Sequence, residues 1–211
     1  MKKALHGLYA ITNETLMPAT LFAEKAEAAL CAGTKIIQYR DKSTDSKKRL
    51  SQARTLKQLC SQYNSILIIN DDIELAKEVD ADGIHIGKDD YSFEQARQQL
   101  GDKKIIGVSC YDQLPLAYSA AKKGADYIAF GSFFSSSIKP DAPRAKASLI
   151  TEFKKEQQTP VCCIGGITTE NHTILLDSGA DMLAIISDIF SHDNTHLISE
   201  TCRVYSEAFK S

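Results

Sequence analysis

The chain has 211 residues, 43% of them hydrophobic, and its 25 basic and 27 acidic side chains give a formal net charge of −2. This length supports one substantial core and matches the usual size of a single α/β barrel. The near-neutral charge argues against a nucleic-acid-binding protein, and no apolar run approaches the ~18 residues of a membrane span.

Six cysteines are spread along the chain without a Cys-x-x-Cys pair, mostly in apolar surroundings: Cys31, Cys60, Cys110, Cys162, Cys163 and Cys202. The N-terminus leads directly into a short strand-like run and lacks the long apolar region of a signal peptide. We therefore expect reduced thiols in a cytoplasmic protein. A redox pair formed by the adjacent Cys162 and Cys163 is an alternative that the sequence leaves open.

Short apolar runs recur along the chain and alternate with segments of helical periodicity. The apolar runs cover residues 8–11, 35–38, 66–69, 83–86, 105–108, 127–130, 161–164 and 182–186. Helical periodicity covers residues 18–30, 44–61, 92–100, 113–123, 145–156, 170–177 and 195–209. Pro18 suits a first helical turn, and Thr44 and Ser92 are candidate N-caps.

A short recurring motif precedes every second apolar run, where a helix ends and a strand begins. The four copies are Ala32-Gly33-Thr34, Ala81-Asp82-Gly83, Gly124-Ala125-Asp126 and Gly179-Ala180-Asp181. Alternating strands and helices imply a parallel sheet, and two strand–helix units repeated four times are typical of a closed barrel. The sequence therefore predicts one single-domain TIM (β/α)8 barrel over residues 1–211, with an open doubly wound sheet as the alternative.

Polar side chains gather after the second predicted strand, in the stretch 36–42. Gln38, Arg40 and Lys42 stand at alternate positions, which share one face in extended backbone. Two cations on one face repel each other unless an anion lies between them, so the stretch predicts a phosphate or pyrophosphate site. The alternative is a strand end with solvated charges.

Two carboxylates follow neighbouring strands, Asp71 after the third and Asp90 after the fourth. In a barrel the carboxyl ends of the strands meet at one face, where the active site lies. Carboxylates with a phosphate nearby suit Mg²⁺, which proteins hold through one or two carboxylates, waters and substrate phosphates. The alternative is that Asp71 caps the next helix, as Asp often does. Asp72 and Asp89 fit solvated or first-turn acids.

A second anion site is predicted after the seventh and eighth strands. Gly165-Gly166 lets the backbone approach a phosphate, and the amides of Ile186-Ser187 would complete the site. A mere tight turn at the glycine pair is the alternative. The serine-rich loop 131–139 could add hydroxyl donors from Ser136 and Ser137 and charge from Lys139, or it could be a plain surface loop.

Taken together, these strand ends resemble the thiamine phosphate synthase family over essentially the whole chain. The matching motifs are Gln38-Tyr39-Arg40-Asp41-Lys42, Asn70-Asp71-Asp72, Gly83-Ile-His-Ile-Gly87 with Asp90, Gly107-Val-Ser109, Gly131 to Lys139, and Ile164-Gly-Gly-Ile167. The resemblance implies an enzyme that joins a pyrimidine methyl diphosphate to a thiazole phosphate and releases pyrophosphate. It also implies small-molecule substrates, no nucleic-acid or membrane partner and one Mg²⁺ per subunit, and it leaves a homo-oligomer open.

The resemblance also implies roles for individual residues. The pyrimidine diphosphate would be held by Gln38, Tyr39, Arg40, Asp41, Lys42, Asn70, Ser109 and Lys139, of which Arg40, Lys42, Ser109 and Lys139 would be catalytic. Asp71 and Asp90 would bind the metal. The thiazole phosphate would be held by Ser136, Ser137, Ile138, Gly166, Ile186 and Ser187.

Three positions depart from the family pattern and leave rival functions to consider. Ile138 stands where the family loop usually has a threonine, Lys88 replaces a common glutamine, and Tyr111 stands where histidine is frequent. The rivals are a thiazole tautomerase-like relative, a Schiff-base aldolase using Lys139, and a non-catalytic sensor of thiazole or thiamine phosphate. The tautomerases use a histidine after the fifth-strand serine, whereas this chain has Tyr111 there.

Overall fold

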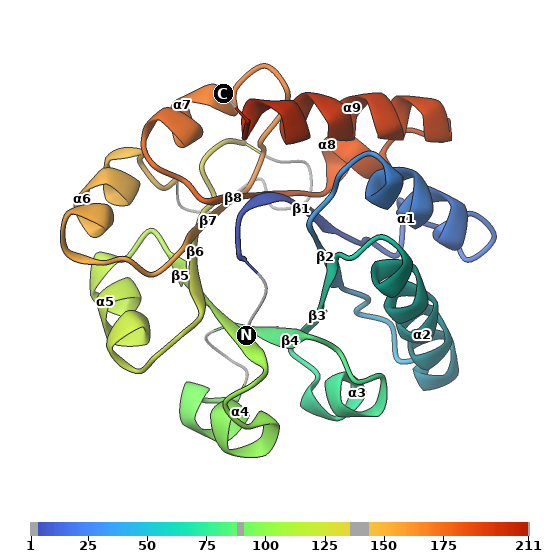
Figure 1. The fold of residues 1–211 in the computed structure, drawn as a ribbon, viewed down its shortest axis with the longest axis horizontal. Coiled ribbons are helices and arrows are strands. Elements are labelled where there is room, and N and C mark those ends of the chain that lie inside the picture. The colour runs from blue at the N-terminus through green and yellow to red at the C-terminus, as the bar shows by residue number, and fades with distance from the viewer. Residues whose placement is uncertain (1–3, 88–90, 136–143, 211) are drawn as a thin grey trace.

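The computed structural model describes residues 4–87, 91–135 and 144–210. Eight parallel strands close into a barrel in chain order, with β8 pairing with β1 (Figure 1). The strands are β1 (Gly7–Ile11), β2 (Ile36–Tyr39), β3 (Ile66–Asn70), β4 (Gly83–Ile86), β5 (Ile105–Tyr111), β6 (Tyr127–Phe130), β7 (Val161–Ile164) and β8 (Met182–Ile185). The predicted (β/α)8 barrel is confirmed, and the open sheet is excluded.

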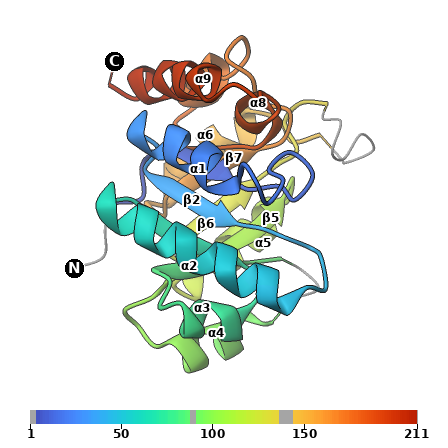
Figure 2. The same ribbon diagram turned by 90° about the vertical axis from the view of Figure 1, so that its right-hand side faces the viewer.

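The helices form a ring outside the strands, as Figure 1 shows. They are α1 (Phe22–Cys31), α2 (Ser46–Gln62), α3 (Ile73–Glu78), α4 (Phe93–Leu100), α5 (Leu114–Lys122), α6 (Ser148–Glu156), α7 (Thr173–Asp177), α8 (Ser187–Phe190) and α9 (Thr195–Ala208). The closing helix α9 packs beside α1 and α8 (Figure 2). No helix within the described ranges has both the length and the apolar character needed to cross a bilayer.

Strict alternation along the strands separates the barrel interior from the layer under the helices. Residues of one parity, such as Tyr9, Ile36 and Ile68, form an interior cluster, while their neighbours pack outward against the helices. Successive strand side chains point to opposite faces, so one strand supplies both layers. The same alternation decides which predicted site residues can reach the interior.

Several helix boundaries differ from the predicted ones. The chain makes a turn at Pro18, whose carbonyl accepts a hydrogen bond from Leu21, and α1 begins only at Phe22. Asp45 rather than Thr44 caps α2, whereas Ser92 caps α4 through a capping box as predicted. The short helices α3 and α8 were not predicted, because six and four residues carry too little periodicity.

The recurring motif has a structural role at the amino ends of the strands. In three of its copies the aspartate accepts a hydrogen bond from a backbone N–H of the preceding strand: Asp82 from Leu67, Asp126 from Ile106 and Asp181 from Val161. A buried backbone donor needs such a partner, which explains why the residue recurs. In the first copy Thr34 donates instead to the Ala29 carbonyl.

All six cysteines are free thiols, and all but Cys31 are buried. Cys162 packs in the barrel interior and Cys163 in the layer under the helices, so their side chains point apart. Burial raises the pKa of both thiols. The adjacent cysteines therefore pack as core residues, and nothing in their geometry favours a redox pair.

Candidate active site

A cavity of about 400 Å³ opens inside the barrel at the carboxyl ends of the strands. Strand residues make up much of its lining, among them Ile11, Asn70 and Ile164, which end β1, β3 and β7. Seven of the residues predicted from the sequence line it together: Gln38, Arg40, Asn70, Ser109, Gly166, Ile186 and Ser187. The barrel thus joins residues from opposite ends of the sequence in one concave site, as ligand sites generally require.

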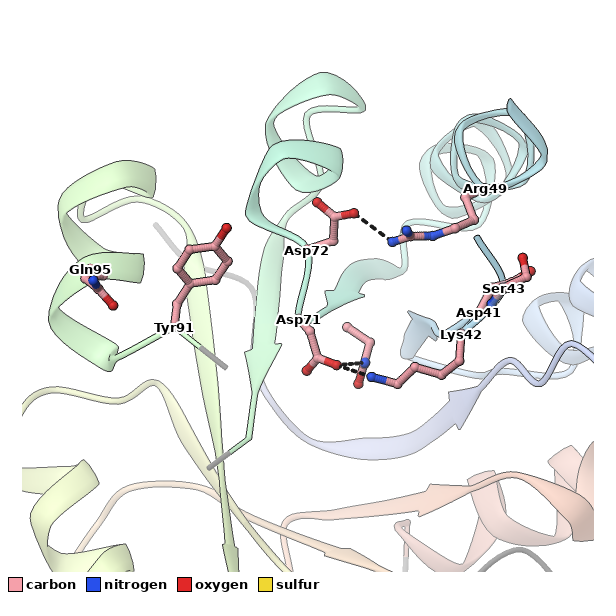
Figure 3. A pocket seen from close by; sticks show the side chains of 9 residues that line it. Asp41, Lys42, Ser43, Arg49, Asp71, Asp72, Tyr91 and Gln95 are labelled. Atoms are coloured by element: carbon pink, nitrogen blue, oxygen red, sulfur yellow. Dashed lines mark hydrogen bonds and ion pairs between the residues drawn. The ribbon is translucent and has the colours of Figure 1, made fainter. Parts of the chain in front are cut away.

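A second, wider and polar pocket of about 650 Å³ lies beside this cavity, and Figure 3 shows its lining. Asn70 lines both spaces, so the two meet at the end of β3. Side chains of both charges surround the second pocket: Asp41, Lys42, Ser43, Arg49, Asp71, Asp72, Tyr91 and Gln95. Its character is suited to a charged, hydrated group rather than to an apolar ring.

Asp71 is held in this second pocket by a local backbone feature. Its φ of 62° lies in the left-handed region, and its carboxylate accepts hydrogen bonds from Lys42 Nζ and Asn70 Nδ2 (Figure 3). The cap of α3 is the next residue, Asp72, which accepts from the Leu75 N–H and pairs with Arg49 at 2.7 Å. The alternative role of Asp71 as a helix cap is therefore wrong, and its carboxylate faces the pocket.

A chain of hydrogen bonds crosses the barrel between residues that line the first cavity. Gln38 Nε2 donates to Tyr9 Oη at 2.7 Å, Tyr9 Oη lies 2.9 Å from Tyr127 Oη, and Tyr127 Oη lies 3.0 Å from His85 Nδ1. His85 Nε2 lies 2.9 Å from Ser109 Oγ. Burial raises the pKa of both tyrosines, so both hydroxyls keep their hydrogen. The sequence pointed to no role for Tyr9, Tyr127 or His85, although strand parity places all three inward.

Comparison with known proteins shows which family the chain belongs to. The family model described as thiamine monophosphate synthase matches residues 8–189. The thiamine-phosphate synthase of Alcanivorax borkumensis is 44% identical over 206 residues, covering 98% of this chain and 95% of the relative. The chain belongs to the thiamine monophosphate synthase family. It is therefore an enzyme, a transferase of thiamine biosynthesis.

Further relatives agree with the family and with the fold. The thiamine-phosphate synthase of Azoarcus sp. is 48% identical over 191 residues, covering 90% of this chain and 92% of the relative. The solved structure of thiamine phosphate pyrophosphorylase from Pyrococcus furiosus superposes with a TM-score of 0.87 at 30% identity, covering 98% of this chain and 96% of that one. Family membership as an enzyme sets aside the non-catalytic sensor.

The structure does not bring Tyr39 to the cavity. Tyr39 lies next to the inward-facing Gln38 on β2, so its side chain points to the opposite side, where it is 2% exposed. Its hydroxyl donates to Gln52 Oε1 of α2 at 3.0 Å, and its ring meets Phe22 of α1 edge to face. The Tyr39 side chain is therefore part of the outer core, and the prediction that it contacts the pyrimidine diphosphate is wrong.

Asp41 and Lys42 also lie differently from expectation, because β2 ends at Tyr39 and the alternation stops there. Lys42 leaves the face shared by Gln38 and Arg40 and enters the second pocket. Asp41 pairs with Lys48 at 2.7 Å and accepts a hydrogen bond from the Ser43 N–H. Burial alone would raise the pKa of Asp41, but these hydrogen bonds outweigh it and lower the pKa. Asp41 thus stabilises the loop after β2, at the edge of the second pocket.

The glycine pair after β7 packs against the loop that follows β6 rather than against the start of a helix. Gly166 has a φ of 63°, and a Cβ there would collide with the backbone of Phe134 and Ser135. The following helix α7 begins only at Thr173, later than the predicted start at residue 170, so its N-terminus does not adjoin Gly166. Ile186 and Ser187, at the start of α8, do line the cavity beside the glycine pair.

Five predicted site residues lie outside the described residues: Asp90, Ser136, Ser137, Ile138 and Lys139. Their assignments stay predictions. Within residues 4–87, 91–135 and 144–210, no group of three or more His, Cys, Asp or Glu side chains could hold a metal ion. The described part of the predicted metal site is thus the Asp71 carboxylate, with the Asn70 side chain beside it.

Proposed function

We propose that the chain couples 4-amino-2-methyl-5-(diphosphomethyl)pyrimidine with a (carboxy)thiazole ethyl phosphate, giving thiamine phosphate and pyrophosphate, with carbon dioxide as a further product when the thiazole carries the carboxyl group. One observation carries the proposal: residues expected to hold two different substrates line one cavity. Gln38, Arg40, Asn70 and Ser109 belong to the first set, and Gly166, Ile186 and Ser187 to the second. A volume of about 400 Å³ falls in the range of small-molecule sites.

The two sets also occupy different arcs of the barrel, which suits substrates of different chemistry. Arg40 follows β2, Asn70 ends β3 and Ser109 lies near the end of β5, so the polar arc runs from β2 to β5. The arc of β6 to β8 presents glycines and apolar groups, among them Ile164 and Ala184. We infer that the diphosphate lies toward the polar arc and the neighbouring pocket, and the thiazole toward the other arc.

In the reaction we propose, the bond between the pyrimidine methylene carbon and the diphosphate oxygen breaks first. The pyrophosphate leaves with the electron pair, and the aminopyrimidine ring stabilises the cation on its methylene carbon. The thiazole nitrogen then attacks that carbon. The role of Arg40, Lys42, Ser109 and Lys139 is to stabilise the negative charge growing on the leaving group, so no nucleophilic side chain is needed.

Asp71 and Asp90 would hold one Mg²⁺ in this proposal. The fit rests on the donor at hand: a carboxylate facing a polar pocket that also contains Lys42. Mg²⁺ binds through one or two carboxylates with waters and substrate phosphates. When bound, the ion would neutralise diphosphate charge and help the leaving group depart. Lys42 pairs with Asp71 at 2.5 Å, and it would be released to contact the diphosphate if Asp71 held the ion.

A reconstituted assay tests the proposal. The purified chain is mixed with the pyrimidine diphosphate, the thiazole phosphate and Mg²⁺, and pyrophosphate and thiamine phosphate are measured. We expect equal amounts of the two products, with none when either substrate is omitted or the metal is chelated. Isomerisation of the thiazole without pyrophosphate release would instead support the tautomerase, and substrate binding without any turnover would contradict both enzymatic readings.

A further inference from the structure

The hydrogen-bond chain along the cavity wall contains three residues to which the sequence assigned no role. Tyr9, Tyr127 and His85 link Gln38 on one side of the barrel to Ser109 on the other. Tyr9 and Tyr127 are almost fully buried, and the His85 ring stacks on the Tyr127 ring with centroids 5.6 Å apart and planes inclined by 21°. The geometry therefore holds the imidazole in one orientation with both nitrogens engaged.

The chain has a direction, and Gln38 sets it. Gln38 Nε2 can only donate, so Tyr9 Oη accepts there and sends its own hydrogen to Tyr127 Oη. Tyr127 then donates to His85 Nδ1, which leaves the imidazole hydrogen on Nε2. His85 Nε2–H donates to Ser109 Oγ, and the serine hydrogen remains for the cavity.

The opposite direction fails at Tyr9. It would make Tyr9 Oη accept from both Gln38 and Tyr127, and the hydrogen of Tyr9 would then need an acceptor of its own. In the described part of the chain the Tyr9 hydroxyl has no third partner. A buried donor without an acceptor is costly, so the first direction is favoured.

We propose that His85 is a positioning residue, and that the relay Gln38–Tyr9–Tyr127–His85 holds the Ser109 hydroxyl as a hydrogen-bond donor toward the cavity. The proposal rests on the proposed function in one respect, that Ser109 contacts the pyrimidine diphosphate. A donor is what a leaving group of growing negative charge requires, whereas a serine that gave its hydrogen to His85 would present only lone pairs. The relay thereby gives the polar arc a hydrogen-bond donor for an anion without adding a charged side chain.

The first test measures the tautomer of His85 in the wild-type chain without substrates. Long-range ¹H–¹⁵N correlation of the ring signals, with His85→Asn used for assignment, shows which nitrogen carries the hydrogen. We expect a hydrogen on Nε2 and none on Nδ1. A hydrogen on Nδ1, or on both nitrogens, would overturn the proposal. This readout does not depend on any reaction, so it stands even if the chain makes no thiamine phosphate.

The second test asks whether His85 acts through Ser109. His85→Gln keeps an N–H donor near the position of Nε2, whereas His85→Asn keeps a polar group only near Nδ1. We expect His85→Asn to lower kcat about tenfold or more and His85→Gln to retain most of it. In a Ser109→Ala background, His85→Asn should add almost no further loss. Equal losses in both backgrounds would overturn the proposal, and His196→Asn, on the exposed face of α9, is the matched control.

Discussion

Gly107 gives the sharpest test of how the barrel interior is packed. It lies on β5 directly against Tyr127, and a Cβ at position 107 would collide with the ring atoms and hydroxyl of that tyrosine. Tyr127 is fully buried, so its ring cannot move without displacing its hydrogen-bond partners Tyr9 and His85. Overpacking costs about 1–3 kcal/mol, and the two hydrogen bonds contribute about 1 kcal/mol each. Gly107→Ala should therefore lower the free energy of unfolding by about 3–5 kcal/mol.

Urea unfolding measures this change. With an m-value of about 3 kcal/mol per M, the midpoint should fall by about 1 M or more. Gly101→Ala is the control, because nothing lies within 4 Å of its added Cβ and only its φ of 73° is unfavourable. With ψ at 178°, this backbone conformation is one that almost only glycine adopts, and it costs about 1–3 kcal/mol for alanine. If Gly107→Ala proved no more destabilising than Gly101→Ala, the packing of Tyr127 against β5 described here would be refuted.

Charged side chains give four more tests. Asp71→Asn should raise the Mg²⁺ concentration for half-maximal turnover about tenfold or more, whereas Glu74→Gln on the exposed side of α3 should not change it. Lys139→Ala should lower turnover about a hundredfold; an unchanged rate would remove Lys139 from the mechanism. Asp41 has a folded pKa below its unfolded one, so it stabilises the fold above the unfolded pKa and loses that contribution as pH falls. Asp41→Asn should accordingly flatten the acid side of a plot of stability against pH. Lys25→Met should cost about 3 kcal/mol in urea unfolding because the carbonyls of Leu16 and Phe190 lose a charged donor, the second of them in a buried hydrogen bond. Asp193→Asn should cost under about 1 kcal/mol since Asp193 is 91% exposed.

The strands were predictable because their pattern is short, apolar and repeated. Seven of the eight observed strands lie within one residue of the predicted ends, and β5 runs on to Tyr111 through a bulge after Ser109. The irregular turns were not predictable in the same way. Before α1, the Asn13 side chain accepts hydrogen bonds from the N–H groups of Thr15 and Leu16 and holds the chain in a turn. A second turn at Pro18 precedes the start of α1 at Phe22. Such local competition with a helix leaves little periodic signal.

The site was predicted best where strand parity applies and worst just beyond it. Gln38 and Ser109 lie on strands and face the cavity as expected. The same parity places Tyr39 on the outer face, so this error was avoidable from the sequence. Lys42 follows the last residue of β2, where loop contacts rather than alternation decide direction. The relay was missed because it joins residues up to 118 positions apart, and no spacing rule covers that separation.

The two ends of the barrel use charge in different ways, and this explains why the repeat predicted the fold but not the site. At the amino ends, Asp126 and Asp181 accept hydrogen bonds from strand N–H groups and form ion pairs with Arg97 and Lys154. These carboxylates therefore stabilise the packing of the strands. That need is the same at each position, and it recurs in the sequence. At the carboxyl ends, groups such as Asp71 stay partly exposed beside open pockets. Each strand end there meets a different part of the cavity, so the residues suited to binding do not repeat, and only their convergence in the folded barrel makes them a site.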